Sequence, residues 1–367
     1  MSSFYNYLSN WDKFDYIKFL QSRTEIDIKQ ILEKEKINEL DFLALLSSKS
    51  DLFLEQMAVK SSSITKREFG QTILIFTPLY LSNFCSNGCT YCGFHKKNKI
   101  KRGKLTKKEI IDEAIKIREL GIQHILILTG GDRIRSPFEY IRDSIIIMKQ
   151  FFKSISIEVY ALSEEEYLEL HRLGVDNLTL YQETYNKSRY EEVHLYGEKR
   201  SYEYRLSAPE RAAKSGFRSV TLGALLGLDN PVIDFFKASL HTLYIRDNFP
   251  GTEVNISLPR LRNSMGNSIK SIELSDKDIT KFIIAYRLFI PRSGISLSTR
   301  ESSKLRNNLL PLGITKMSAQ SKTTVGGHSE VKGDEQFEIS DKRSVKELHR
   351  DLVSMSFQPV YKDWDII

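Results

Sequence analysis

The chain has 367 residues, 41% of them hydrophobic and 28% charged, which is ordinary for a globular protein. The formal net charge of +7 is a mild excess for this length and favours a solvated surface over a nucleic-acid-binding one. We expect a cytoplasmic protein, because the start lacks the features of a signal peptide, no apolar run reaches the ~20 residues that span a bilayer, and three cysteines argue against a secreted disulfide scaffold.

Residues 1–70 are polar and carry the apolar spacing of helices. Thr24 and Glu25 are capping residues ahead of a helical apolar period that begins at Ile26. A second helix is predicted over Leu40–Leu54, with Asp41 as its cap. No chemistry is visible in this region, so we expect a helical amino-terminal extension that packs on the rest of the chain.

From residue 71 the pattern changes to short β-branched runs, each followed by an amphipathic helix. Helices are predicted over Lys107–Leu120, Glu164–Leu173, Ala208–Ser215, Asp276–Ile290 and Lys304–Leu309, and another begins at Pro231. The predicted strands are Thr72–Leu81, His124–Thr129, Ser154–Ala161, Asn177–Gln182, Ser219–Leu222, Val254–Leu258, Gly294–Ser298 and Ile314–Ser318.

Eight strands that alternate with helices are parallel, because each crossover returns the chain to the same end of the sheet. This pattern predicts an α/β fold, a (β/α)8 barrel over residues 71–320, with a doubly wound open sheet as the alternative. After about residue 320 the alternation stops. Residues 321–367 are predicted to form a C-terminal extension with a helix over Ser344–Met355.

All three cysteines, Cys85, Cys89 and Cys92, lie within eight residues, directly after the first predicted strand. Three thiolates in this CxxxCxxC spacing can ligate three irons of a [4Fe–4S] cluster and leave the fourth iron open to a substrate or cofactor. The alternatives are free buried thiols, or a structural zinc site with His95 as a fourth ligand. The gathering of every cysteine in one short loop favours the iron–sulfur cluster.

Polar groups follow four further predicted strands. In a parallel barrel the chemistry gathers at the C-terminal ends of the strands, so we expect these groups to face one cavity together with the cysteines. They lie in the runs Thr129–Asp132, Tyr181–Thr184, Ser298–Glu301 and Ser318–Ser321.

The cysteine run, with the aromatic Tyr91 before its last cysteine, resembles the signature of the radical S-adenosylmethionine (SAM) enzymes. Further runs make the chain similar to the aromatic amino acid lyases, and among them to the 2-iminoacetate synthases, the tyrosine lyases of thiamine thiazole biosynthesis. These runs cover nearly the whole chain in the family's order. They are Thr-Tyr-Cys-Gly-Phe (90–94), Tyr-Gln-Glu-Thr-Tyr (181–185), Gly-Ala-Leu-Leu-Gly-Leu (223–228), Leu-Ser-Thr-Arg-Glu-Ser (297–302) and Lys-Asp-Trp-Asp (362–365).

The resemblance implies a (β/α)8 barrel that holds a [4Fe–4S] cluster on Cys85, Cys89 and Cys92, with SAM bound to the open iron. Asp132 stands where relatives often carry the longer Glu. The SAM-binding residues that the resemblance implies are Tyr91 and Leu225 at the adenosyl part, Gly130, Gly131 and Asp132 at the methionine end, Glu183 at the ribose hydroxyls and Arg205 at the carboxylate.

The implied substrate is L-tyrosine, whose carboxylate would pair with the forked guanidinium of Arg300, while Ser318 and Ser321 would hold its amino group. A 5′-deoxyadenosyl radical would take a hydrogen atom from that amino group. Cleavage of the Cα–Cβ bond would then give 2-iminoacetate and p-cresol. The implied partners are a flavodoxin- or ferredoxin-type electron donor and thiazole synthase as acceptor of the labile imine, with no nucleic acid or membrane.

Three other functions are open on the sequence. A hydrogenase-maturation tyrosine lyase begins with the same cleavage, but its relatives carry a further cysteine-bound cluster near the C-terminus, and this chain has no cysteine after Cys92. A tryptophan lyase would use a related arginine-containing site. A non-catalytic zinc-binding scaffold is the third.

Overall fold

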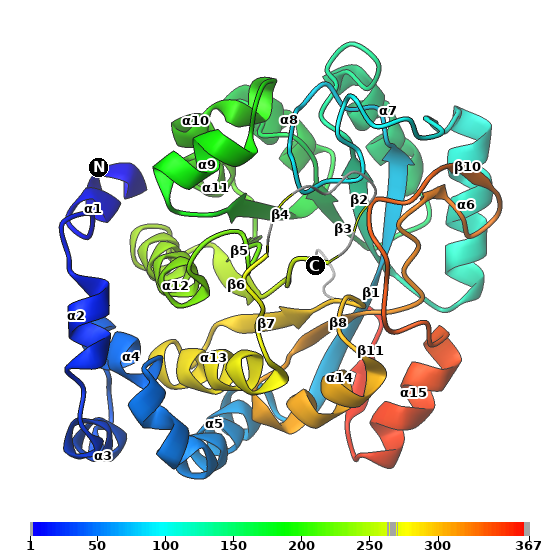
Figure 1. The fold of residues 1–367 in the computed structure, drawn as a ribbon. Coiled ribbons are helices and arrows are strands. Elements are labelled where there is room, and N and C mark those ends of the chain that lie inside the picture. Colours follow the sequence, from blue (N-terminus) through cyan, green and yellow to red (C-terminus); the bar gives the residue numbers. More distant parts are fainter. Residues whose placement is uncertain (1–2, 263, 265–268, 270, 363–367) are drawn as a thin grey trace.

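The computed structural model describes residues 3–262, 264, 269 and 271–362, and its centre is a closed barrel of parallel strands (Figure 1). Neighbouring barrel strands follow one another in chain order, and β1 pairs with both β2 and β8. The barrel strands are β1 (Thr72–Ser82), β2 (His124–Thr129), β3 (Ser154–Glu158), β4 (Val175–Glu183), β5 (Ser219–Ala224), β6 (Glu253–Ser257), β7 (Gly294–Leu297) and β8 (Lys316–Ser318).

Strand β1 closes the barrel because it is long enough to pair on both sides. Its residues Leu74–Phe76 pair with Lys316–Ser318 of β8, and Thr77–Ser82 pair with β2. An open doubly wound sheet would leave its two edge strands unpaired with each other. The predicted (β/α)8 barrel is therefore confirmed, and the open-sheet alternative is wrong.

Helices on the outside of the barrel connect its strands, as predicted, but α7 was not foreseen. Its segment contains the β-branched run Ile145-Ile146-Ile147, and no side chain caps its start at Pro137, so the sequence lacks a helix signal there. The connecting helices are α6 (Lys107–Glu119), α7 (Phe138–Met148), α8 (Glu164–Arg172), α9 (Lys187–Val193), α10 (Tyr202–Leu206), α11 (Ala208–Lys214), α12 (Pro231–Asn248), α13 (Asp276–Phe289) and α14 (Ser303–Leu309), with 3₁₀ turns η2 (Glu198–Arg200) and η3 (Leu310–Leu312).

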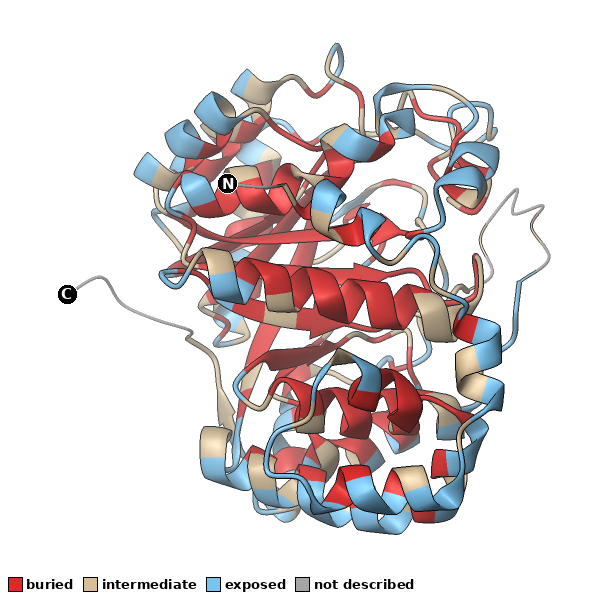
Figure 2. Ribbon diagram, turned by 90° about the vertical axis from the view of Figure 1, so that its left-hand side faces the viewer, coloured by how far each residue is buried: buried red, intermediate tan, exposed pale blue. Residues whose placement is uncertain are grey.

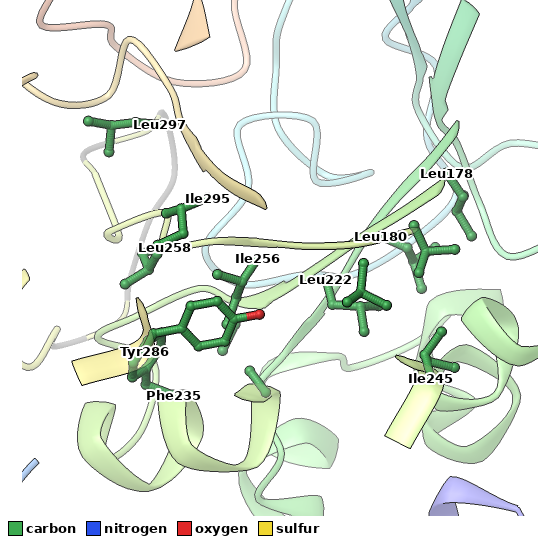
Figure 3. Close-up of a cluster of buried hydrophobic side chains, with 14 of the residues drawn as sticks. Leu178, Leu180, Leu222, Phe235, Ile245, Ile256, Leu258, Tyr286, Ile295 and Leu297 are labelled. Atoms are coloured by element: carbon green, nitrogen blue, oxygen red, sulfur yellow. The ribbon is translucent and has the colours of Figure 1, made fainter. Parts of the chain in front are cut away.

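The core is the apolar layer between the strands and the surrounding helices. Figure 2 shows buried strands inside helices whose outer faces are exposed. In Figure 3, Leu180 of β4 and Ile256 of β6 belong to the same buried cluster as Phe235 of α12 and Tyr286 of α13. Each such side chain contributes about 1.5–3 kcal/mol when it is fully buried, so this layer holds the strand ends in fixed positions.

The amino-terminal residues form the predicted helical extension, and α1, α4 and α5 pack against α12 and α13 on the outside of the barrel (Figure 1). The cap at Thr24 is confirmed. The single helix over Leu40–Leu54 is wrong: Asn38 caps α4, and Ser50 turns the chain by donating its hydroxyl to the carbonyls of Leu45 and Ser47. The elements are α1 (Phe4–Ser9), α2 (Tyr16–Gln21), α3 (Glu25–Glu33), α4 (Glu39–Leu45), η1 (Ser48–Phe53) and α5 (Leu54–Phe69).

The chain after β8 adds short strands to the barrel sheet. β11 pairs in parallel with the first residues of β1, and Val325 of β9 pairs with Tyr80. Ser344 caps α15, which confirms the predicted C-terminal helix. The domain boundaries near residues 70 and 320 stay a prediction, and residues 363–365 of the Lys-Asp-Trp-Asp run lie outside the described residues. The elements are β9 (Val325–Gly326), β10 (Val331–Gly333), α15 (Val345–Ser354) and β11 (Gln358–Val360).

None of the helices in the described ranges has both the length and the apolar character that crossing a bilayer requires.

Candidate active site

A cavity lies at the C-terminal ends of the barrel strands, where the loop after β1 meets the ends of several other strands. Its empty space, counting the open mouth, is about 1140 Å³. It brings together most of the site residues predicted from the sequence. Those that line it are Cys85, Cys89, Tyr91, Cys92, Gly130, Gly131, Glu183, Arg205, Leu225 and Arg300.

The cysteine loop is held by hydrogen bonds from outside it. The Arg102 guanidinium donates to the carbonyls of Asn83, Phe94 and His95, at 2.6, 3.0 and 2.7 Å. A β-bridge joins Cys89 to His194, beyond β4. The loop is therefore fixed at both of its ends before any ligand binds.

Two of the three sulfurs accept hydrogen bonds from side-chain amides. Asn87 Nδ2 lies 3.5 Å from Cys85 Sγ, and Gln336 Nε2 lies 3.5 Å from Cys92 Sγ. Burial raises the pKa of the Cys89 thiol to about 12, so iron must displace a proton when it binds there. Three soft sulfur donors on one cavity, two of them with N–H donors, fit a [4Fe–4S] cluster.

His95 is not directed at the cysteines. Its Nδ1 accepts a hydrogen bond from the Lys97 amide at 3.0 Å, and its ring packs edge-on against Tyr196. In the described part of the chain, no three His, Cys, Asp or Glu side chains are grouped as ligands of a single metal ion. His95 is therefore not positioned as the fourth ligand that the structural zinc site would need.

On the β4 side of the cavity, Glu183 forms ion pairs with Lys199 at 2.5 Å and with Arg205 at 3.5 Å. Burial opposes ionisation of Glu183, but these two cations outweigh it and lower the pKa of the carboxyl group. The Glu183 backbone has a φ of 73°, a strained value for a residue other than glycine. Such strain at a strand end is typical of a ligand-binding position.

Tyr91 lies beside this ion-paired group. Its hydroxyl is 2.8 Å from Nε2 of His194, and the Lys199 ammonium lies over its ring, 5.6 Å from the centroid. Arg205 also donates from Nε to the Tyr181 carbonyl at 2.8 Å, which fixes its direction. Leu225 is buried and lines the same wall of the cavity.

The two glycines after β2 permit a close approach to the cysteine loop, whereas Asp132 does not line the cavity. A Cβ on Gly131 would lie 2.4 Å from Asn87 Nδ2, and one on Gly130 would lie 2.3 Å from the Phe84 carbonyl oxygen. The Asp132 carboxylate accepts hydrogen bonds from the amides of Ile134 and Arg135, both at 3.0 Å, and stabilises the turn. A contact between Asp132 and SAM stays a prediction without support from this geometry.

Arg300, after β7, faces the cavity and stacks on Phe337, with its guanidinium carbon 3.4 Å from the ring centroid. Among the described residues no carboxylate lies within ion-pair distance of it, whereas the adjacent Glu301 is paired with Arg260 and Arg262. Burial lowers the pKa of Arg300, although arginine remains charged at neutral pH. An unpaired guanidinium in a cavity suits an anionic ligand.

Ser318 and Ser321 are not among the residues that line the cavity. The Ser318 hydroxyl accepts a hydrogen bond from the Thr299 amide at 3.2 Å. The Ser321 hydroxyl is buried, without a hydrogen-bond partner in the described structure. A substrate contact for either serine stays a prediction.

Sequence reasoning missed several residues that line the cavity. Glu158 is the last residue of β3. The predicted strand continued three residues further, so Glu158 lay inside it rather than at a strand end. Gln336 and Phe337 come from the chain beyond the barrel, and no local pattern signals that this segment returns to β1. Asn87 and Lys199 are the others that carry polar groups close to the cysteines or to Glu183.

Comparison with known proteins agrees with this arrangement. Residues 79–237 match the family model of the Radical SAM superfamily, and residues 257–358 match the Biotin and Thiamin Synthesis associated domain. The chain is 37% identical over 358 residues to 2-iminoacetate synthase of Escherichia coli (strain K12), which covers 97% of this chain and 94% of that one. The chain belongs to the 2-iminoacetate synthase family. The enzyme of that name from Salmonella typhimurium is also 37% identical, over 357 residues, 97% of this chain and 94% of the relative.

The 2-iminoacetate synthase family shares its fold with hydrogenase maturation proteins. A crystal structure of HydG, a maturase of the [FeFe]-hydrogenase, has a TM-score of 0.89 and 32% identity, and the match covers 95% of this chain and 80% of that one. Membership of the radical SAM superfamily confirms the expected cofactors, a [4Fe–4S] cluster and SAM, and sets aside the zinc scaffold.

Proposed function

We propose that this protein is a tyrosine lyase that cleaves the Cα–Cβ bond of L-tyrosine to 2-iminoacetate and p-cresol, for thiazole formation in thiamine biosynthesis. The observation that carries the proposal is Arg300, an arginine without a carboxylate partner among the described residues, in the same cavity as the three cysteines. The 37% identity to 2-iminoacetate synthases over 97% of the chain supports the reaction. The protein is accordingly a carbon–carbon lyase.

The cofactor-binding residues follow from the cavity lining. Cys85, Cys89 and Cys92 would hold the cluster, which would supply the electron for the reductive cleavage of SAM. The Glu183 carboxylate would accept hydrogen bonds from the ribose hydroxyls. Arg205, which donates to the Tyr181 carbonyl, would pair with the carboxylate of SAM.

The proposed substrate site is built around Arg300, which lines the same cavity. Arg300 pairs with the tyrosine carboxylate through two parallel N–H donors, and Phe337 keeps the guanidinium plane in place. Tyr80, which donates its hydroxyl to Gln336 Oε1 at 2.7 Å, anchors this wall to β1. The chain's own residues position the amino acid and exclude water, which would hydrolyse the imine.

Two partners follow from the reaction. An electron donor of the flavodoxin or ferredoxin type is acidic, and the exposed lysines Lys96, Lys97 and Lys99 lie just after the cysteine loop. Thiazole synthase is the acceptor of the imine, because a product that hydrolyses in water is best passed on directly.

The test is an anaerobic assay of reconstituted protein with dithionite, SAM and L-tyrosine, with the products separated by chromatography. We expect 5′-deoxyadenosine, p-cresol and glyoxylate, the last from hydrolysis of the imine. Deoxyadenosine without p-cresol would keep the radical SAM chemistry and reject tyrosine, and L-tryptophan would then be the next substrate to assay.

A further inference from the structure

Glu158 and Arg300 present opposite charges to one cavity from the ends of two different strands, β3 and β7. Among the described residues, neither side chain has an ion-pair partner, and the Glu158 carboxylate has no hydrogen bond. Both residues are partly buried, and an unpaired charge that is partly removed from water is unfavourable unless a ligand compensates it. An unpaired cation and an unpaired anion in one cavity therefore indicate a ligand that carries both charges, as the backbone of a free α-amino acid does.

We propose that Glu158 binds the ammonium group of the amino-acid substrate whose carboxylate pairs with Arg300. The inference rests on the proposed function and adds a substrate-binding residue to it. A charge-assisted N–H···O contact at the amino group, together with the pair at Arg300, fixes the amino acid at two points. Two fixed points at the same carbon orient its side-chain bond in the cavity.

The other two carboxylates that line the cavity already have cationic partners. Glu183 is paired with Lys199 and Arg205, and Glu198 is paired with Arg133. Ser318 and Ser321, the residues predicted to contact the amine, are not among those that line the cavity. Glu158 is thus the carboxylate of the lining that is left for a cationic ligand group.

The ionisation of Glu158 responds to its surroundings. Burial, and after it the neighbouring Glu183 carboxylate, raises the pKa of Glu158 to about 7. A bound ammonium favours the carboxylate form, so the affinity for the amino acid should rise as the pH increases from 6 to 8. The titratable and charged groups that act on Glu158 are Tyr80 of β1, Tyr181 and Glu183 of β4, Lys199 of η2, Arg205 of α10 and Arg300 after β7.

The experiment measures binding without turnover. Cluster-loaded enzyme with SAM and no reductant is titrated anaerobically with L-tyrosine and with 3-(4-hydroxyphenyl)propanoate, which lacks the amino group. The wild type should bind tyrosine on the order of 10- to 100-fold more tightly. In Glu158→Gln the Kd of tyrosine should rise to that of the analogue, and its pH dependence between pH 6 and 8 should disappear.

Matched variants separate binding from folding. Glu158→Asp keeps the charge and should retain part of the preference for tyrosine, while Glu165→Gln, on the exposed part of α8, should change nothing. A Glu158→Gln enzyme that still prefers tyrosine to the analogue overturns the inference. So does a variant that instead loses discrimination against L-phenylalanine, because Glu158 would then contact the ring hydroxyl. If the wild-type enzyme makes no p-cresol, the proposed function is contradicted. That outcome is distinct from a failure of the Glu158 inference, which the binding titrations test.

Discussion

At the scale of single residues, the chemistry depends on charges that the protein leaves uncompensated. Most buried arginines here have partners: Arg306 is paired with Asp341, and Arg205 with Glu183. Among the described residues, the partly buried Arg300 has no carboxylate partner and stacks on Phe337 in the cavity. An unpaired cation that is partly removed from water destabilises the fold. A substrate anion would compensate it, which is the explanation that we propose for Arg300 at this strand end.

Arg300→Lys tests this explanation. Lysine keeps the charge but cannot make two parallel N–H contacts or stack on Phe337, so kcat/KM for tyrosine should fall about 100-fold. SAM binding should be unchanged, since the proposed SAM contacts are made by Glu183 and Arg205 and lysine keeps the positive charge at position 300. Steady-state p-cresol formation and anaerobic SAM titration measure the two effects. Arg292→Lys, on an exposed side chain, is the control, and unchanged tyrosine kinetics in Arg300→Lys would refute the substrate assignment.

Cys89→Ala tests whether the three cysteines hold the iron–sulfur cluster. With one of the three thiolates removed, a second iron has no protein ligand, and we expect loss of most bound iron and acid-labile sulfide and of all SAM cleavage. The buried Cys89 side chain is small, so the barrel should remain folded by far-ultraviolet circular dichroism. Full SAM cleavage by this variant would contradict the cysteine assignment.

At the scale of elements, the segment from β9 to Phe337 completes the site from outside the barrel. Its turn is held by Glu113 of α6, a buried carboxylate that accepts hydrogen bonds from the amides of His328, Ser329 and Glu330 at 2.9, 2.9 and 3.1 Å. Further along, Gln336 donates to Cys92 Sγ. An anchor on α6 thus positions a donor at the cysteine loop.

Glu113→Gln should loosen this segment. An amide offers one oxygen in place of two and brings its own N–H groups toward the three backbone donors, so at least one buried N–H loses its partner. We expect a loss of about 1–3 kcal/mol in the free energy of unfolding and faster amide exchange over residues 325–337. Urea unfolding and hydrogen-exchange mass spectrometry measure both. Glu119→Gln, exposed on the same helix, should stay within about 0.5 kcal/mol of the wild type, and equal values for the two variants would rule out the anchor.

At the scale of the whole molecule, features with a repeating or local sequence pattern could be predicted. Contacts between segments far apart in the sequence could not. The strand–helix alternation predicted the barrel, and local spacing predicted Cys85, Cys89 and Cys92. It could not predict that residues 325–337 lie back across β1, because that contact joins segments about 250 residues apart in sequence. Glu158 was missed because no local signal marks where a buried strand ends. Asp132 was predicted from its position in a motif, whereas its carboxylate is used by the turn.

The amino-terminal extension is attached to the barrel through packing of α1 on α12. Phe4 of α1 stacks on His241 of α12 with ring centroids 3.9 Å apart, and the Tyr185 hydroxyl lies 3.1 Å from Nδ1 of that histidine. Burial lowers the pKa of His241 to about 3. The unfolded chain, with an ordinary histidine pKa near 6.5, therefore binds a proton that the folded protein does not bind between these values.

Stability should consequently fall as the pH drops below about 6.5, and His241→Asn should remove this part of the dependence. Between pH 7.5 and 5.5 one such histidine accounts for a loss of about 1.4 kcal/mol in the free energy of unfolding. Urea unfolding of cluster-loaded protein at both pH values measures the difference. His349→Asn, on the exposed face of α15, should keep the slope of the wild type. If His241→Asn keeps that slope too, protonation of the histidine beneath Phe4 does not control the stability of the attached extension.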